Sequence, residues 1–276
     1  MDLVHPEVSG NKFFKLKYNL EEAVKSGYDT ILTFGGAYSN HIYATAKAAE
    51  ASGLKSIGII RGEELSELNP TLKSAKESGM RLEFISRSDY RRKAEPEFIK
   101  LLDEKFGEFF LIPEGGTNSL AILGTGEILT PEDFEFTHIA CSIGTGGTFA
   151  GLSHSIKPHQ KLMGISSLKG DFIHEEVKVL LNSTRKKYSS QYEILDDYHF
   201  GGYAKHTPEL IAFINDFHEK YKVPLDIIYT GKTAFAILDH VKKGNFKAGS
   251  KILMIHTGGL QGNLGFTEKT GISLPL

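Results

Sequence analysis

The stretch SIGTGGTFAG, residues 142–151, predicts a strand that ends in a glycine-rich turn, after which a helix begins. Glycines leave the backbone N–H groups at a helix start open to a ligand, and such groups bind anions. The dinucleotide fingerprint G-x-G-x-x-G fails, because Phe149 stands where its third glycine belongs. The stretch therefore favours a compact phosphate over a pyrophosphate, with an ordinary strand–helix turn as the alternative.

Short apolar runs alternate with helical patterns on both sides of this stretch. Residues 57–60 and 252–255 are apolar or glycine at consecutive positions, which is typical of strands covered on both faces of a parallel sheet. Residues 208–217 carry a helical apolar stripe behind the start signal Thr207-Pro208. This alternation predicts an α/β fold whose ligands lie at the carboxyl ends of the strands. The expected strands are 29–34, 55–61, 81–86, 109–112, 136–142, 162–166, 226–229 and 251–256.

Composition places the chain among ordinary globular proteins. Its 276 residues include 32 Lys and Arg against 34 Asp and Glu, a formal net charge of -2, which argues against a dedicated nucleic-acid binder. The single cysteine, Cys141, excludes an internal disulfide framework and favours a reducing compartment. Residues 136–156 lack charged side chains but are too polar to cross a bilayer, and residues 1–14 show no secretory signal. We therefore expect a cytoplasmic protein with no membrane and no nucleic-acid partner.

Two familiar classes of site are not supported by the motifs. Gly231, Lys232 and Thr233 resemble the end of a P-loop, but Asp226 occupies the position of its first glycine. The His, Cys and carboxylate residues show no spacing typical of metal ligands. We therefore expect neither an NTPase nor a metal site.

Two segments near the N-terminus are weak signals when taken separately. Residues 9–12, Ser-Gly-Asn-Lys, place Lys12 in a polar turn before a helix, where most lysines are simply solvated. Residues 34–41, FGGAYSNH, end a strand and open a helix, and helix capping alone would explain Ser39 or Asn40. Neither segment alone predicts a function.

Taken in order, these motifs resemble those of fold type II pyridoxal-phosphate enzymes. They are most similar to the group that contains 1-aminocyclopropane-1-carboxylate deaminase and D-cysteine desulfhydrase. Five motifs in the right order are specific for this family and less specific for the substrate. The resemblance is carried by SGNK at 9–12 with KLKY at 15–18, GGAYSNH at 35–41, GTGGT at 144–148, YTGK at 229–232 and HTGG at 256–259.

The resemblance implies a fold and an assembly. Two open, mostly parallel α/β sub-domains of the tryptophan synthase β-like architecture would enclose the active site in the cleft between them. The larger, cofactor-binding sub-domain would comprise residues 1–14 and 126–276, and the smaller, with the Ser-Asn-His motif, residues 15–125. Relatives carry an N-terminal arm that we expect to be missing here, and the family suggests a homodimer.

The resemblance also implies how the cofactor is bound. Lys12 would hold pyridoxal 5'-phosphate through a Schiff base, and burial in a cleft would supply the lowered pKa that this lysine needs. Asn40 would bind the phenolic oxygen of the cofactor, with Tyr229 against the pyridine ring and Thr230 near its nitrogen. The phosphate would lie on Gly144, Thr145, Gly146, Gly147 and Thr148, without a lysine or arginine partner, because residues 136–156 contain none.

A second active-site tyrosine of the family pattern has no exact match in this chain. The implied catalytic residues are Lys12, Ser39 and Tyr229, with Ser39 facing the substrate. The deaminase pattern has another tyrosine, which falls at Phe200 in this chain. Tyr198 and Tyr203 are close enough in sequence to take its place.

We therefore expect a pyridoxal-phosphate-dependent lyase that deaminates a small amino acid, with a hydrolase-like second stage. Thr230 stands where the deaminase pattern has a glutamate, and a hydroxyl cannot hold a proton on the ring nitrogen as a carboxylate does. This favours D-cysteine desulfhydrase-like β-elimination, giving pyruvate, ammonia and sulfide, over opening of the cyclopropane ring to 2-oxobutanoate. The remaining alternative is an inactive pyridoxal-phosphate-binding protein.

Overall fold

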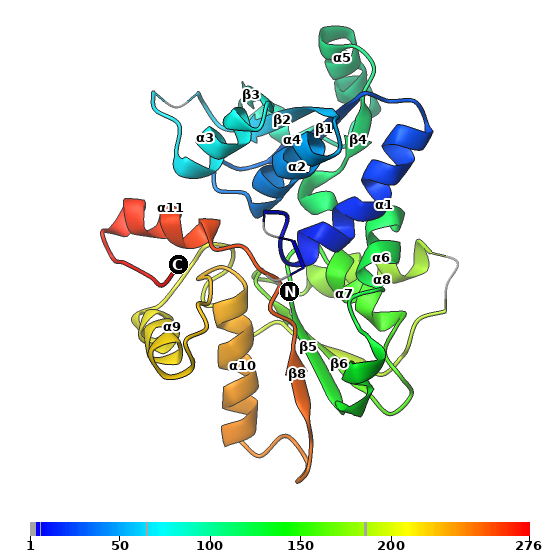
Figure 1. Ribbon diagram of the computed structural model, residues 1–276. Helices are drawn as coiled ribbons and strands as arrows, with labels where there is room; N and C mark the ends of the chain where they lie inside the picture. Colours follow the sequence, from blue (N-terminus) through cyan, green and yellow to red (C-terminus); the bar gives the residue numbers. More distant parts are fainter. Residues whose placement is uncertain (1–3, 6, 65, 185–186) are drawn as a thin grey trace.

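Two parallel sheets organise the chain. The computed structural model describes residues 4–5, 7–64, 66–184 and 187–276. Within these ranges the strands form two separate four-stranded sheets, in the orders β3-β2-β1-β4 and β7-β6-β5-β8 (Figure 1). Every described strand pair is parallel. The predicted α/β fold built on parallel sheets is confirmed.

The first sheet uses the apolar runs of the N-terminal half. Its central strand is β1, in which Ile31 pairs with Ser56 on one side and Phe110 on the other. β1 and β2 are buried along most of their length, because helices cover both faces of the sheet. The strands are β1 (Thr30–Gly35), β2 (Lys55–Arg61), β3 (Arg81–Ile85) and β4 (Phe110–Ile112), and the helices between them are α2 (Asn40–Ala51), α3 (Pro70–Glu77), α4 (Arg87–Arg91) and α5 (Pro96–Phe106).

The second sheet carries the glycine-rich turn at the end of its strand β5. Phe149, which replaces the third glycine of the dinucleotide fingerprint, is buried beneath this sheet against Gly164, where a Cβ would lie 2.6 Å from its ring. The fingerprint therefore fails because its third position is used for the core. The strands are β5 (His138–Ile143), β6 (Lys161–Ser166), β7 (Tyr192–Leu195) and β8 (Ile252–Met254), and the helices are α7 (Gly147–Ser153), α8 (Phe172–Asn182), α9 (Pro208–Tyr221), α10 (Thr230–Lys242) and α11 (Gln261–Thr270).

Helix α1 (Asn11–Lys25) lies between the two sheets (Figure 1). It packs against α2 on the side of the first sheet and against α6 (Ser119–Thr125), which in turn contacts α7. The α1–α6 contact is close, because a Cβ at Gly124 would lie 2.0 Å from the carbonyl oxygen of Phe14. Two short 3-10 turns, η1 (Glu114–Gly116) and η2 (Pro131–Glu135), complete the described elements. The predicted boundary after residue 14 falls inside α1, and the division into sub-domains stays a prediction.

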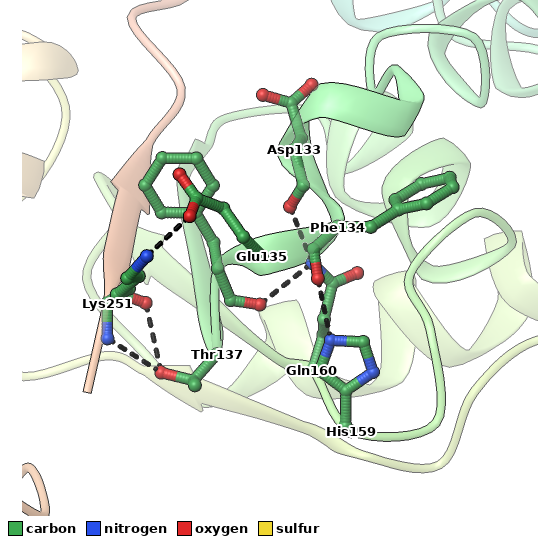
Figure 2. Close-up of polar contacts among 8 residues, drawn as sticks. Asp133, Phe134, Glu135, Thr137, His159, Gln160 and Lys251 are labelled. Atoms are coloured by element: carbon green, nitrogen blue, oxygen red, sulfur yellow. Dashed lines mark hydrogen bonds and ion pairs between the residues drawn. The ribbon is translucent and has the colours of Figure 1, made fainter. Parts of the chain in front are cut away.

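A polar cluster fixes the start of β5 (Figure 2). Gln160 is buried and its amide donates to the carbonyls of Asp133 and Phe136, each at 2.9 Å. One residue further on, the Thr137 hydroxyl donates to the carbonyl of Lys251 and accepts from its N–H, both at 3.0 Å. These bonds hold β5 between β6 and β8, and so set where the strand delivers the glycine-rich turn.

One predicted strand is wrong, and one observed strand is not among the predictions. Residues 226–229 form a turn, because the Asp226 carboxylate accepts the N–H groups of Ile228, Tyr229 and Thr230 at 2.7–2.9 Å. This carboxylate replaces a neighbouring strand as the hydrogen-bond partner of the apolar run. β7, by contrast, lies in a stretch of charges and tyrosines whose apolar pattern is too short to predict a strand.

Two classes of feature are absent from the described ranges. No helix in them combines the length and the apolar character needed to cross a bilayer. No three His, Cys, Asp or Glu side chains in them gather as a group that could hold a metal ion.

Candidate active site

A cavity of about 860 Å³ opens where strands of both sheets end. The first sheet contributes residues that follow β1 and β4, and the second contributes residues that follow β5 and β8. This is the carboxyl edge of each sheet, where open α/β sheets bind their ligands. The volume is within the usual range of small-molecule sites, about 300–1,000 Å³.

Most residues singled out in the sequence line this cavity. The lining includes Lys12, Ser39, Asn40, Tyr229, Gly144, Thr145, Gly146, Gly147 and Thr148. Thr230 is not part of the described lining; it is buried, and its hydroxyl donates to Asp226 Oδ1 at 2.8 Å. Segments that are far apart in the chain therefore meet at one site, while a role for Thr230 at the ring nitrogen stays a prediction that this placement does not favour.

The glycine-rich loop forms one wall of the cavity. β5 ends at Ile143, and α7 begins at Gly147. Gly146 adopts a left-handed conformation (φ 79°), and a Cβ there would lie 2.7 Å from Leu180 on the side of α8. A Cβ at Gly147 would instead lie 3.2 Å from the Nζ atom of Lys15. The absence of a Cβ at Gly147 therefore leaves space between the loop and the Lys15 ammonium.

Lys12 stands in the first turn of α1. The turn is fixed by Gly10, whose φ is 66° and where a Cβ would lie 2.0 Å from the carbonyl oxygen of Thr257, and by the Asn11 N–H, which donates to the same oxygen at 3.0 Å. The Lys12 ammonium donates to the Gly115 carbonyl at 3.3 Å. Burial lowers the pKa of Lys12 to about 8. A lysine with this pKa has a sizeable neutral fraction near pH 8, as a nucleophilic amine requires.

Lys15 lies one turn further along α1 and is only 2% exposed. Its ammonium donates to the Gly115 carbonyl at 2.9 Å and to the hydroxyls of Thr117 and Thr145 at 2.8 and 3.2 Å. Burial, and then the charge of Lys12, hold the pKa of Lys15 well below its ordinary value. The glycine-rich loop therefore has a basic neighbour, and the expectation that its phosphate has no lysine partner stays a prediction that this contact does not favour. The spacing of three residues from Lys12 is a sequence signal for this, because it places both lysines on one helix face.

The Ser-Asn-His segment forms the start of α2 in the cavity lining. Ser39 caps the helix by accepting the N–H groups of His41 and Ile42 at 3.2 and 3.3 Å. The Asn40 amide donates to the Gly259 carbonyl at 3.4 Å, while its Oδ1 atom is buried without a hydrogen-bond partner among the described residues. An unsatisfied buried acceptor at a cavity wall is a position that a bound polar group would complete.

His41 adds a neutral ring beside the two lysines. Its Nε2 atom lies 2.7 Å from the Thr33 hydroxyl, which donates its own proton to the Ile112 carbonyl at 2.8 Å. The ring must therefore donate from Nε2. Burial, followed by the charges of Lys12 and Lys15, holds the pKa of His41 well below its ordinary value. His41 thus adds no positive charge to the cavity.

Two tyrosines, Tyr203 and Tyr229, contact each other in the cavity lining. Tyr229 precedes α10, and its ring meets that of Tyr203 at 6.2 Å and 65°. Both line the cavity. Phe200 instead packs edge-to-face on Phe235 at 5.0 Å, and Tyr198 donates to Asp239 on α10 at 2.5 Å. Of the three positions considered for a second tyrosine, Tyr203 is the one that the structure brings to the site.

The two carboxylates in the described lining are already paired. Glu114 accepts from the Tyr90 hydroxyl at 2.7 Å and lies 3.3 Å from the Lys93 ammonium. Glu268 on α11 accepts from the hydroxyl of Tyr38. The positive charges of Lys12 and Lys15, by contrast, have only neutral hydrogen-bond acceptors among the described residues. The interior of the site therefore favours an anion.

Comparisons with known proteins agree with this chemistry. A family described as "Pyridoxal-phosphate dependent enzyme" matches residues 1–258. The chain is 31% identical to the mitochondrial bifunctional D-cysteine desulfhydrase/1-aminocyclopropane-1-carboxylate deaminase of Arabidopsis thaliana, over 95% of this chain and 71% of that protein. It is 26% identical to a D-cysteine desulfhydrase of Klebsiella pneumoniae (strain 342), over 91% and 83%. The crystal structure of an "ACC deaminase homologue" superposes with a TM-score of 0.82 at 32% identity, over 97% and 85%.

The residues around the cavity fit pyridoxal phosphate. The glycine-rich loop and the Lys15 ammonium together offer backbone and charged donors to a phosphate. Lys12 offers an amine of lowered pKa to the aldehyde, and the unsatisfied Oδ1 atom of Asn40 offers an acceptor. When bound, this cofactor withdraws electrons from the carbon that bears the amino group of a substrate.

Lys12 is predicted to be the lysine that holds the cofactor, because it lines the cavity with a pKa of about 8 and has one long hydrogen bond, whereas Lys15 is held by three acceptors. Borohydride reduction of the loaded protein followed by peptide mapping should label Lys12. Lys232 is the internal comparison, since its pKa is also lowered to about 8 but it is not in the described lining. A label on Lys232 or Lys15 would overturn the assignment.

Cofactor attachment is predicted to follow the titration of Lys12. Only the neutral amine attacks an aldehyde, so the attachment rate in cofactor-free protein should rise with pH through about 8 and then level off. Stopped-flow absorbance measures this rate, with Lys12→Ala as the control that shows no covalent phase. A rate that keeps rising to the ordinary lysine value of 10.5 would contradict the lowered pKa.

Lys15→Met is predicted to weaken cofactor retention by at least about tenfold, or about 1.4 kcal/mol. The change removes a charge-assisted donor from the loop and, because that charge is buried among neutral groups, it should not destabilise the cofactor-free protein. Equilibrium dialysis and thermal unfolding measure the two effects. The matched control is Lys17→Met on the same helix, whose ammonium pairs with Glu127 at the surface. Equal retention in both variants would place the phosphate away from Lys15.

Proposed function

The chain belongs to the pyridoxal-phosphate dependent enzyme family, and within this family we propose that it releases sulfide, pyruvate and ammonia from D-cysteine. The observation that carries the proposal is the lack of an unpaired carboxylate in the described lining of the cavity, where Glu114 and Glu268 are both occupied. Without a carboxylate to hold a proton on the ring nitrogen, the bound cofactor would supply weaker electron withdrawal. A reaction in which a good leaving group departs as the proton is removed suffers least from this loss.

The proposed reaction balances with one water. D-Cysteine and water give pyruvate, ammonia and hydrogen sulfide, and the carbon–sulfur bond breaks by elimination. Water enters only when the nitrogen leaves, so the enzyme is a lyase, and the hydrolase description expected beside it is not supported. The amino acid as substrate agrees with the names of the relatives.

We assign the proton transfers to the residues on the two walls. Lys12, with a pKa of about 8, would take the α-proton of the bound substrate. Burial raises the pKa of Tyr203, and burial with the neighbouring Tyr203 raises that of Tyr229 further, so both phenols stay protonated and able to donate. One of them protonates the departing sulfur. Ser39 and Asn40, at the start of α2, contact the substrate and the cofactor respectively.

Opening of the cyclopropane ring of 1-aminocyclopropane-1-carboxylate is the second candidate. It is favoured by one observation, the contact between Tyr203 and Tyr229 in the cavity lining, because the deaminase pattern contains two active-site tyrosines. The expectation that Phe200 leaves this pattern incomplete therefore no longer argues against ring opening. The argument for D-cysteine depends on the ring nitrogen alone.

A cytoplasmic homodimer completes the proposal. The single cysteine, Cys141, is free and buried, which suits a reducing compartment. The resemblance to the family supports two copies. Sedimentation of the loaded protein would measure the number of copies directly.

The loaded protein is predicted to turn over D-cysteine at least about tenfold more efficiently than 1-aminocyclopropane-1-carboxylate, a difference of about 1.4 kcal/mol in activation free energy. Sulfide and pyruvate report the first reaction, 2-oxobutanoate reports the second, and L-cysteine tests chirality. Lys12→Ala is the control for contaminating activity. Comparable or faster ring opening would reject the argument from the ring nitrogen, whereas pyruvate from L-cysteine alone would reverse the chirality.

A further inference from the structure

Lys232 is a fully buried lysine behind the cavity. Its side chain is 0% exposed, and it is not among the described residues that line the site. Its ammonium donates to the carbonyls of His199 and Gly202, both at 2.8 Å. A buried ammonium costs free energy unless its N–H groups donate hydrogen bonds. Here two of these groups bind carbonyls of one short loop.

This loop, residues 199–204, has an unusual backbone. Phe200 and Ala204 have φ of 51° and 53°, and Gly201 and Gly202 have φ of 97° and 116°. Non-glycine residues rarely adopt such values, and they persist only where surrounding contacts enforce them. Within the chain, the loop is closed by turn bonds from Gly202 N–H to the His199 carbonyl and from Lys205 N–H to the Gly202 carbonyl, both at 3.0 Å. Lys232 binds the same two carbonyls.

The loop presents Tyr203 to the cavity. Tyr203 is 47% exposed and its ring contacts that of Tyr229, so its position depends on its backbone and on this contact. The peptide that carries the Gly202 carbonyl also forms the backbone of Tyr203, so the bond from Lys232 acts one peptide away from it. Lys232 and Tyr229 both belong to the start of α10, and thus one helix end sets both members of the tyrosine pair.

We propose that Lys232 is a positioning residue: through the carbonyls of His199 and Gly202 it holds the loop 199–204, and thereby sets Tyr203 against Tyr229. The effect on turnover rests on the proposed function, in which these phenols contact the substrate. The effect on the loop itself does not. Two experiments separate the two parts.

The first experiment measures the loop without using turnover. Lys232→Met keeps an unbranched side chain of similar length and removes the donors. Hydrogen–deuterium exchange of the loaded protein should then quicken at least about tenfold for peptides covering 199–205, with little change in α7 and β5. Tyr198→Phe is the matched control. Tyr198 directly precedes the loop, and this change also removes a hydrogen bond to α10, the one that Tyr198 donates to Asp239. Exchange in the loop that stays at the wild-type rate in Lys232→Met would overturn the proposal.

The second experiment is a double-mutant cycle on turnover of D-cysteine. Lys232→Met and Tyr203→Phe should each lower kcat by at least about tenfold while the absorbance spectrum of the resting cofactor stays unchanged. The double variant should be no slower than Tyr203→Phe alone, because the lysine acts through the tyrosine. Multiplied effects, or an unchanged kcat in Lys232→Met, would overturn the positioning role. If Lys232→Met does not fold, Lys232→Gln, which keeps an N–H donor on a shorter side chain, takes its place with a smaller loss expected.

Failure of the proposed function gives a different result. If the wild-type protein turns over no substrate but Lys232→Met still quickens exchange in the loop, the proposed activity is rejected and the positioning role of Lys232 is supported. If Tyr203→Phe leaves turnover unchanged, the catalytic role of that phenol is rejected, and so is the effect of Lys232 on turnover.

Discussion

The site depends on the buried ammonium of Lys15, which joins three segments of the chain. Its acceptors are the Gly115 carbonyl and the hydroxyls of Thr117 and Thr145, all of them neutral. Removing an ammonium from water costs several kcal/mol when no opposite charge replaces the solvent, and the neighbouring charge of Lys12 adds repulsion. An anion between this lysine and the glycine-rich loop relieves both costs. Binding of the cofactor phosphate and stability of this half of the cavity are therefore linked.

Close backbone approach is the second constraint, and it aligns the two helix starts that carry the functional side chains. The segment after β8 lies against both of them. The Thr257 carbonyl accepts a hydrogen bond from the Asn11 N–H, next to Gly10, where a Cβ has no room. The Gly259 carbonyl accepts one from the Asn40 amide. One segment of the second sheet thus sets the start of α1 and of α2. Lys12 and Asn40 face the same cavity because both helices begin on this common support.

The sequence predicts the sheets well because seven of the expected strands are apolar runs that two layers of helices bury. The prediction fails at residues 226–229, an apolar run that forms a turn. The Asp226 carboxylate accepts the N–H groups of the residues two to four positions further along the chain. Lys15 is recognisable from its spacing to Lys12, but its acceptors come from segments about a hundred residues away. The choice among Phe200, Tyr198 and Tyr203 cannot be made from the sequence, because it depends on φ values that tertiary contacts impose.

The two walls of the cavity differ in how they are held, and this difference bears on the reaction. The residues assigned to the cofactor lie at helix starts and at a strand end, whereas Tyr203 stands on a loop with positive φ values and is 47% exposed. Burial raises the pKa of both phenols, and it raises that of Tyr229 well above its ordinary value. Under the proposed function we therefore expect Tyr203, with the smaller rise, to give up its proton more readily to the departing sulfur. The loop that Lys232 holds would then control the leaving-group step, while the start of α1, which carries Lys12, lies outside that loop.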